Sequence, residues 1–143
     1  MDVLIDTNII MDYITKRVSS PNLDASIRAI EMCTASDIHG YVAFHSISNL
    51  WFSLRTMPQN IRRQWLIYIC EILTVIGTEH DKVIRALHNR EFKDFEDCLQ
   101  DECAIHANVD YIITWNIADY KLSHVPAITP LQWIDLYKEV LNK

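Results

Sequence analysis

Short apolar runs alternate with longer helical stretches along the whole chain, and this alternation constrains the fold more than any other feature. Val3-Leu4-Ile5 has the pattern of a short buried strand, and residues 7–15 after it have the spacing of a helix. Strands that are separated by helices are joined by right-handed crossovers, which gives a parallel sheet with helices on both faces. The sequence therefore predicts an α/β domain. Its strands are expected at 3–5, 41–44, 72–76, 111–114 and 127–129, and its helices at 7–15, 23–35, 47–54, 58–69, 81–90, 94–107 and 130–141.

The composition fits one globular domain that spans residues 1–143. Hydrophobic residues make up 50% of the chain and charged residues 22%, which is typical of a folded domain rather than a disordered chain. No apolar run approaches the roughly 20 residues of a membrane span, and the N-terminus lacks the basic region of a signal peptide. We therefore expect a cytoplasmic protein that makes no contact with a membrane.

The cysteines indicate neither a zinc site nor a disulfide framework. Cys33, Cys70, Cys98 and Cys103 form no CxxC pair, and no Cys/His cluster has zinc-site spacing. Without a secretion signal the thiols are expected to stay reduced. Free cysteine is among the most buried residue types, so we expect all four to be buried with a structural role.

The net charge of −6 bears on the kind of partner that the chain can bind. An acidic chain argues against a protein that grips nucleic acid through a broad basic surface. It leaves open a nuclease whose acidic site is neutralised by divalent cations.

Asp6 stands immediately after the first apolar run and before the first helix. In parallel sheets, ligands bind outside the carboxyl ends of the strands, so this position makes Asp6 a candidate site residue. The same position also suits a helix cap, a role that Asp6, Thr7 or Asn8 could fill.

Asp94, Asp97 and Asp101 are spaced to share one face of the helix predicted at 94–107. Like charges in that arrangement repel one another by a few tenths of a kcal/mol per exposed pair, so a bound cation would stabilise them. The alternative is that Asp94 caps the helix, Asp97 is favoured by the helix dipole and Asp101 is solvated.

The strand predicted at 111–114 is followed by Asn116 and Asp119, which therefore lie in a loop at its carboxyl end. Either residue could simply form an Asx turn. However, the sheet rule directs this loop and Asp6 to the same edge. Oxygen ligands of this kind suit Mg²⁺ or Mn²⁺ rather than zinc. His45 and Ser46 also lie near a strand end, but no acid is placed to orient them, so we expect a capping role.

Three segments, in order, resemble the PIN-domain family. Residues 1–10 (MDVLIDTNII) look like its opening strand and DTN motif, and residues 94–99 (DFEDCL) resemble its helix with a metal-binding aspartate. Residues 112–120 (IITWNIADY) look like its closing T-x-N/D-x-x-D-F segment. The similarity spans nearly the whole chain.

The resemblance implies a Rossmann-like three-layer α/β/α sandwich with a central, mostly parallel sheet. It also implies cleavage of RNA that depends on Mg²⁺ or Mn²⁺. Many similar bacterial members are VapC-like toxins, which pair with a small antitoxin and are often dimeric. RNA, an antitoxin and a second copy of the chain are therefore the expected partners.

The family's functional residues can be carried over to matching positions of this sequence. By this resemblance Asp6 is the first metal ligand and Asp97 the third acid. Asn116 stands where many members have the fourth acid, and Asp119, one loop turn later, is expected to share in metal binding and catalysis. Asn8 would support the site by hydrogen bonding. Thr114 would orient ligands or water from the strand end.

Two positions depart from the family pattern. Asn49 stands where the second acid is expected, and Asn116 replaces a common aspartate, so each brings an amide without charge. Asn49 and Asp94 are therefore assigned only supporting roles. Trp115 occupies a position that is often basic, and it either stacks on a base or packs in the interior. Two alternatives remain: a PIN-like binding module with weak or lost catalysis, and an aspartyl-phosphate phosphotransferase, whose usual second aspartate is Asn8 here.

Overall fold

The computed structural model describes residues 1–17 and 22–143, which form a five-stranded parallel sheet between layers of helices. The strand order is β3-β2-β1-β4-β5, and every neighbouring pair is parallel. This confirms the three-layer α/β/α prediction. The strands are β1 (Asp2–Ile5), β2 (His39–Ala43), β3 (Thr74–Ile76), β4 (Tyr111–Ile113) and β5 (Ala127–Ile128). The helices are α1 (Thr7–Thr15), α2 (Leu23–Met32), α3 (Phe44–Ser53), α4 (Gln59–Ile72), α5 (His80–His88), α6 (Phe95–Ala107), the 3₁₀ helix η1 (Ile117–Tyr120) and α7 (Pro130–Leu141).

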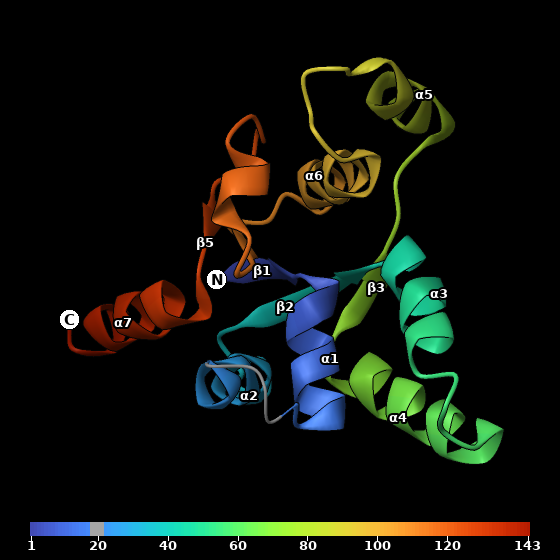
Figure 1. The fold of residues 1–143 in the computed structure, drawn as a ribbon. Coiled ribbons are helices and arrows are strands. Elements are labelled where there is room, and N and C mark those ends of the chain that lie inside the picture. The colour runs from blue at the N-terminus through green and yellow to red at the C-terminus, as the bar shows by residue number, and fades with distance from the viewer. Residues whose placement is uncertain (18–21) are drawn as a thin grey trace.

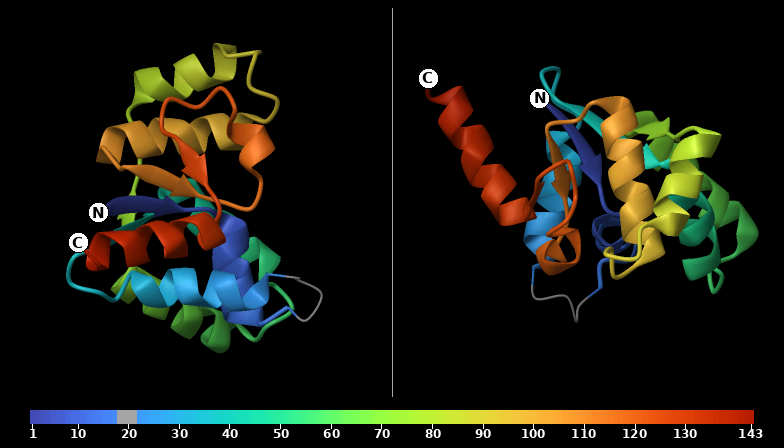
Figure 2. Two further views of the ribbon diagram at one scale, coloured as in Figure 1. Left: turned by 90° about the vertical axis from the view of Figure 1, so that its left-hand side faces the viewer. Right: turned by 90° about the horizontal axis from the view of Figure 1, so that it is seen from above.

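The two faces of the sheet are covered by different helices (Figures 1 and 2). α1, α2, α4 and α7 lie on one face, and α5 and α6 lie on the other. Successive side chains of a strand point to opposite faces. Accordingly, Val3 and Ile5 belong to the core under α1 and α2, whereas Leu4 packs with Cys103 and Ala104 of α6. This explains why β1 is a continuous apolar run.

The order of the strands reverses between the neighbouring strands β1 and β4. From β1 the chain moves outward through β2 to β3. It then returns through α5 and α6, and β4 pairs with the other side of β1. Asp6, just beyond β1, stays tied to β4 because its N–H donates to the carbonyl of Ile113 at 3.0 Å. Ligands of open parallel sheets bind where the strand order reverses in this way.

The starts of α6 and α7 are explained by their N-caps. The Asp94 carboxylate accepts hydrogen bonds from the backbone N–H groups of Glu96 and Asp97 and begins α6. At α7, Thr129 and Gln132 form a reciprocal capping box around Pro130. The start of the last helix at Pro130 is therefore as predicted.

Several predicted boundaries and exposures are wrong. The second strand ends at Ala43, and Phe44 already begins α3, so Ser46 lies inside the helix and does not cap it. The third strand begins only at Thr74, because α4 continues to Ile72. All four cysteines are free thiols, but Cys70 is exposed on α4. None of the described helices is both long enough and apolar enough to cross a membrane.

Candidate active site

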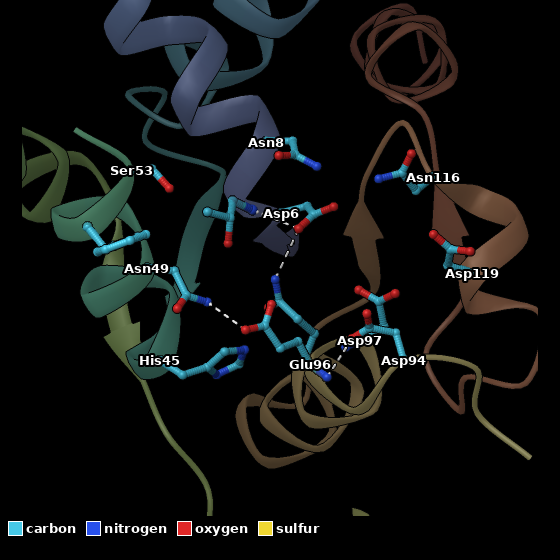
Figure 3. A pocket seen from close by; sticks show the side chains of 13 residues that line it. Asp6, Asn8, His45, Asn49, Ser53, Asp94, Glu96, Asp97, Asn116 and Asp119 are labelled. Atoms are coloured by element: carbon cyan, nitrogen blue, oxygen red, sulfur yellow. Dashed lines mark hydrogen bonds between the residues drawn. The ribbon is translucent and has the colours of Figure 1, made fainter. Parts of the chain in front are cut away.

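A polar cleft of about 380 Å³ lies at the carboxyl ends of β1 and β4 (Figure 3). Its walls come from the start of α1, from α3, from the start of α6 and from η1. Five lining residues are carboxylates, and none is lysine or arginine. The lining residues are Asp6, Thr7, Asn8, His45, Asn49, Phe52, Ser53, Asp94, Glu96, Asp97, Gln100, Asn116 and Asp119.

Asp6 is the deepest acid of the cleft, with only 7% of its surface exposed. Its Oδ1 accepts from the Thr7 N–H at 2.7 Å and from Gln100 Nε2 at 3.2 Å, and its Oδ2 accepts from Thr114 Oγ1 at 2.8 Å. Burial raises the pKa of Asp6 despite these donors, and the nearby charge of Asp119 adds to the rise. Asp6 therefore caps α1 and also carries a poorly compensated charge.

Asp97 lies in the first turn of α6 and is half-buried. Its pKa is raised to about 6, first by desolvation and then by the charges of Asp94 and Asp6, with a smaller contribution from Asp119. The Tyr120 hydroxyl donates to Oδ1 at 3.2 Å and opposes this rise. Asp6, Asp97 and Asp119 are thus close enough to repel one another, although they come from distant parts of the sequence.

Gln100 is a site residue that the sequence did not reveal. It is 3% exposed, and its Nε2 is used in the hydrogen bond to Asp6. Its Oε1 is buried and has no hydrogen-bond partner among the described residues. An unpartnered buried acceptor costs about 1–3 kcal/mol, so the cleft holds an oxygen that a ligand could satisfy.

The wall formed by α3 is neutral. His45, Asn49 and Ser53 are four residues apart and present one side of the helix to the cleft. Asn49 Nδ2 donates to Glu96 Oε1 at 3.3 Å, which joins α3 to the start of α6 across the cleft (Figure 3). The pKa of His45 is lowered by burial and raised in part by the charge of Glu96.

The remaining predicted residues occupy different depths. Asn116, Asp119 and Asn8 line the cleft, whereas Thr114 is fully buried behind it. Thr114 Oγ1 donates to Asp6 and accepts from the Asn116 N–H at 3.0 Å. Asp94 lines the cleft and also caps α6, so the capping role proposed for it is confirmed.

Asp101 does not belong to this group, so the predicted stripe of three carboxylates is wrong. It is 2% exposed rather than solvated, and its carboxylate accepts from the N–H groups of His124 and Val125 and contacts His124 Nδ1 at 3.0 Å. Asp94 is a cap outside the helix, so the spacing that would align it with Asp101 does not apply.

The chemistry of the lining fits a hard divalent cation. Carboxylates that repel one another and an unpartnered amide oxygen are ligands that Mg²⁺ or Mn²⁺ prefers. Asp6, Asp97 and Asp119 could hold such an ion. In the described part of the chain no three His, Cys, Asp or Glu side chains already surround one point, so these acids would have to adjust around the ion.

A family model described as PIN domain matches residues 2–118. The chain belongs to the PIN-domain family. Solved structures with a similar fold include VapBC2 from Rickettsia felis bound to a DNA fragment from their promoter. The matched chain is 16% identical, with a TM-score of 0.68, and the match covers 90% of this PIN domain and 98% of the other chain. A toxin–antitoxin complex from Klebsiella pneumoniae is 19% identical, with a TM-score of 0.66 over 90% and 97% of the two chains. VapBC-1 from nontypeable Haemophilus influenzae is 12% identical, with a TM-score of 0.67 over 92% and 99%.

These likenesses concern the fold of the PIN domain. No curated protein matches the chain. Besides Gln100, the cleft residues that the sequence did not reveal are Glu96, Phe52 and Ser53, and His45 and Thr7 line the cleft although the sequence indicated only a capping role for them. The spacing of His45, Asn49 and Ser53 on one helix side was the available signal for α3. Glu96 and Gln100 stood four residues apart beside the recognised Asp97.

Proposed function

We propose that this PIN domain is an endoribonuclease that hydrolyses RNA phosphodiester bonds with Mg²⁺ or Mn²⁺. The observation that carries the proposal is the cleft at the reversal of strand order, which Asp6, Asp97 and Asp119 line together and which, among the described residues, no lysine or arginine lines. Five carboxylates would repel an RNA phosphate. A cation in the cleft reverses that repulsion, which makes the cation a requirement for substrate binding.

Asp6, Asp97 and Asp119 would hold the cation, and Asn116, Asn49 and Asp94 would support it. A divalent cation bound there would polarise a phosphate and acidify water. The chain itself fixes the acids. Hydrogen bonds orient Asp6 from three directions, and the Tyr120 hydroxyl orients Asp97.

One edge of the cleft offers contacts for a single strand of RNA. Phe52 lines the cleft and is 65% exposed, and the Arg55 guanidinium lies 4.3 Å from its ring centre. Arg62 and Arg63 lie over the ring of Trp51, the residue before Phe52 on α3. An exposed ring can stack on a base while arginines bind the backbone, which fits single-stranded RNA.

The cleavage test compares the purified wild type with Asp97→Asn on unstructured RNA. We expect cleavage in Mg²⁺ or Mn²⁺, none in EDTA, and loss of cleavage in the variant although it stays folded. Cleavage that persists in EDTA, or that the variant retains, would contradict the proposal.

We further propose that the chain is the toxin of a toxin–antitoxin pair and acts as a homodimer. The support is its fold, which is similar to that of chains in solved toxin–antitoxin complexes. Co-expression with the product of a short reading frame beside its gene should give a stable complex in which cleavage is suppressed. Light scattering of the chain alone should give twice the mass of 16.7 kDa.

A second candidate is a PIN-like binding module without catalysis. The amides of Asn49 and Asn116 favour it, because each removes a charge from the site that the family pattern expects. This module would bind RNA or protein and show no cleavage that depends on Asp97.

A further inference from the structure

The carboxylates of the cleft are distributed unevenly. The α3 wall contributes only neutral side chains, His45, Asn49, Phe52 and Ser53. The start of α6, which faces it, contributes three carboxylates, two of which already have assigned parts: Asp94 caps the helix and Asp97 belongs to the central group. Glu96 is the remaining acid.

Glu96 reaches toward the neutral wall. Asn49 Nδ2 donates to Glu96 Oε1 at 3.3 Å, so the amide that stands in the acid's place on α3 holds a carboxylate from α6 (Figure 3). No lysine or arginine of residues 1–17 and 22–143 forms an ion pair with Glu96. Glu96 is exposed at the cleft, so its carboxylate is accessible to a ligand there.

A second observation points to a missing ligand at the same place. Gln100 follows Glu96 by four residues, so the two side chains share one side of α6. Gln100 lines the cleft and is 3% exposed, and its buried Oε1 has no partner among the described residues. A buried acceptor of this kind normally meets a protein group, a water molecule or an ion.

We propose that Glu96 on α6 supplies the carboxylate that α3 lacks, and that it binds the same divalent cation as Asp6 and Asp97. In this exchange of the carboxylate from α3 to α6 the charge of the site stays the same. Asn49 positions the carboxylate of Glu96 and does not itself contribute a charge. The Oε1 of Gln100 faces the cation or its water shell. This inference rests on the proposed function, since it assumes that the cleft binds a divalent cation.

The test measures Mn²⁺ binding at neutral pH by the loss of the free-ion electron paramagnetic resonance signal, so it needs no RNA and no activity. Glu96→Gln is expected to weaken binding by about tenfold or more. Glu91→Gln is the matched control, because it removes the same charge from an exposed residue that does not line the cleft. This control should bind as the wild type does. Thermal unfolding verifies that each variant is folded.

A double variant tests whether the two walls serve one ion. Asn49→Glu combined with Glu96→Gln returns the carboxylate to α3, and we expect it to recover most of the lost affinity. A double variant that binds no better than Glu96→Gln alone would overturn the exchange.

The outcomes separate this inference from the proposed function. If the wild type binds Mn²⁺, Asp97→Asn binds weakly and Glu96→Gln binds normally, the role of Glu96 is refuted while the metal-dependent nuclease stands. If the wild type binds no Mn²⁺, both proposals fail. Equal weakening by Glu91→Gln would show a general charge effect and would also refute the role of Glu96.

Discussion

Two sets of buried or half-buried carboxylates in this molecule are compensated differently. Away from the cleft, each buried acid meets strong donors. Arg85 makes two hydrogen bonds to Glu102, at 2.9 and 2.7 Å, and Arg17 makes two to Asp12, at 2.9 and 2.7 Å. Asp101 accepts from two backbone N–H groups and contacts His124. Such pairing is what a buried charge ordinarily requires.

The cleft acids lack that compensation. Asp6 has neutral donors only, and Asp97 has one hydroxyl. Both have a raised pKa, whose largest cause is desolvation. Asp97 and Asp101 lie on the same helix about one turn apart, so the local chain does not explain the difference. The first part of α6, up to Gln100, therefore lines the cleft with charges that are left for a ligand, whereas the acids that follow, Asp101 and Glu102, are paired.

The largest expected effect comes from neutralising the deepest cleft acid. Asp6→Asn should lower RNA cleavage by about 100-fold or more, because it removes a charge that would hold the cation. Asp110→Asn makes the same change at an exposed residue just before β4, at the amino ends of the strands and away from the cleft. It should leave cleavage unchanged. If the Asp6→Asn variant is as active as this control, the cleft acids do not differ in function from the other acids of the molecule.

Removing a paired, structural acid should lower the stability of the fold and leave cleavage unchanged. Asp101→Ala leaves the N–H groups of His124 and Val125 without their acceptor, and it should lower the free energy of unfolding by roughly 3 kcal/mol. Cleavage per folded molecule should not change. Urea unfolding measures the loss, with Asp135→Ala on the exposed face of α7 as a control expected to change stability by less than about 0.5 kcal/mol. A loss no larger than the control's would mean that Asp101 is not structural.

The carboxyl group of Asp97 should make the folded chain less stable as the pH rises. The pKa of Asp97 is about 6 in the folded chain against 3.8 for an unperturbed aspartate, so the folded state binds this proton more tightly. The stability that the proton contributes is complete below about pH 4 and is lost as the pH rises through about 6. Asp97→Asn should therefore stabilise the protein at neutral pH, by on the order of 1 kcal/mol once half-exposure is allowed for.

Thermal unfolding in EDTA, followed as a function of pH, measures this effect without a cation. The advantage of Asp97→Asn should disappear below about pH 4, where the wild-type carboxyl is protonated in both states. A variant that is destabilised at neutral pH would place Asp97 with the paired, structural acids.

The sequence was sufficient for most of the fold and for the edge where the site lies. Apolar runs and helical spacing depend on local side-chain pattern, and the rule for parallel sheets then brings Asp6 and the loop with Asp119 together. The end of β2 was missed because Phe44 extends the apolar run, although it is 71% exposed at the start of α3.

The finer composition of the site depends on how the helices dock. Asp97, Gln100 and Asp101 lie within two turns of α6, and the placement of this helix against the sheet and η1 decides which of them enter the cleft. Asp97 meets Tyr120 and Asp101 meets His124, both from the distant segment after β4, and a single sequence does not reveal these contacts. Glu96 likewise acquires its significance only through Asn49, 47 positions away on α3.

The smallest expected effect concerns Trp115, for which the sequence left base stacking and interior packing open. Its Nε1 donates to Ser26 Oγ at 2.9 Å, and Ser26 in turn donates to Asp12 at 2.8 Å, so the ring belongs to the paired, structural set. It also packs against the core around α1 and α2. Trp115→Phe keeps a ring but removes the donor, and it should lower the free energy of unfolding by about 1 kcal/mol. RNA binding should stay the same, whereas Phe52→Ala should weaken it because the exposed ring at the cleft is lost. If Trp115→Phe instead weakens RNA binding and leaves stability unchanged, Trp115 is not part of the structural set. The loop after β4 then belongs to the RNA-binding surface.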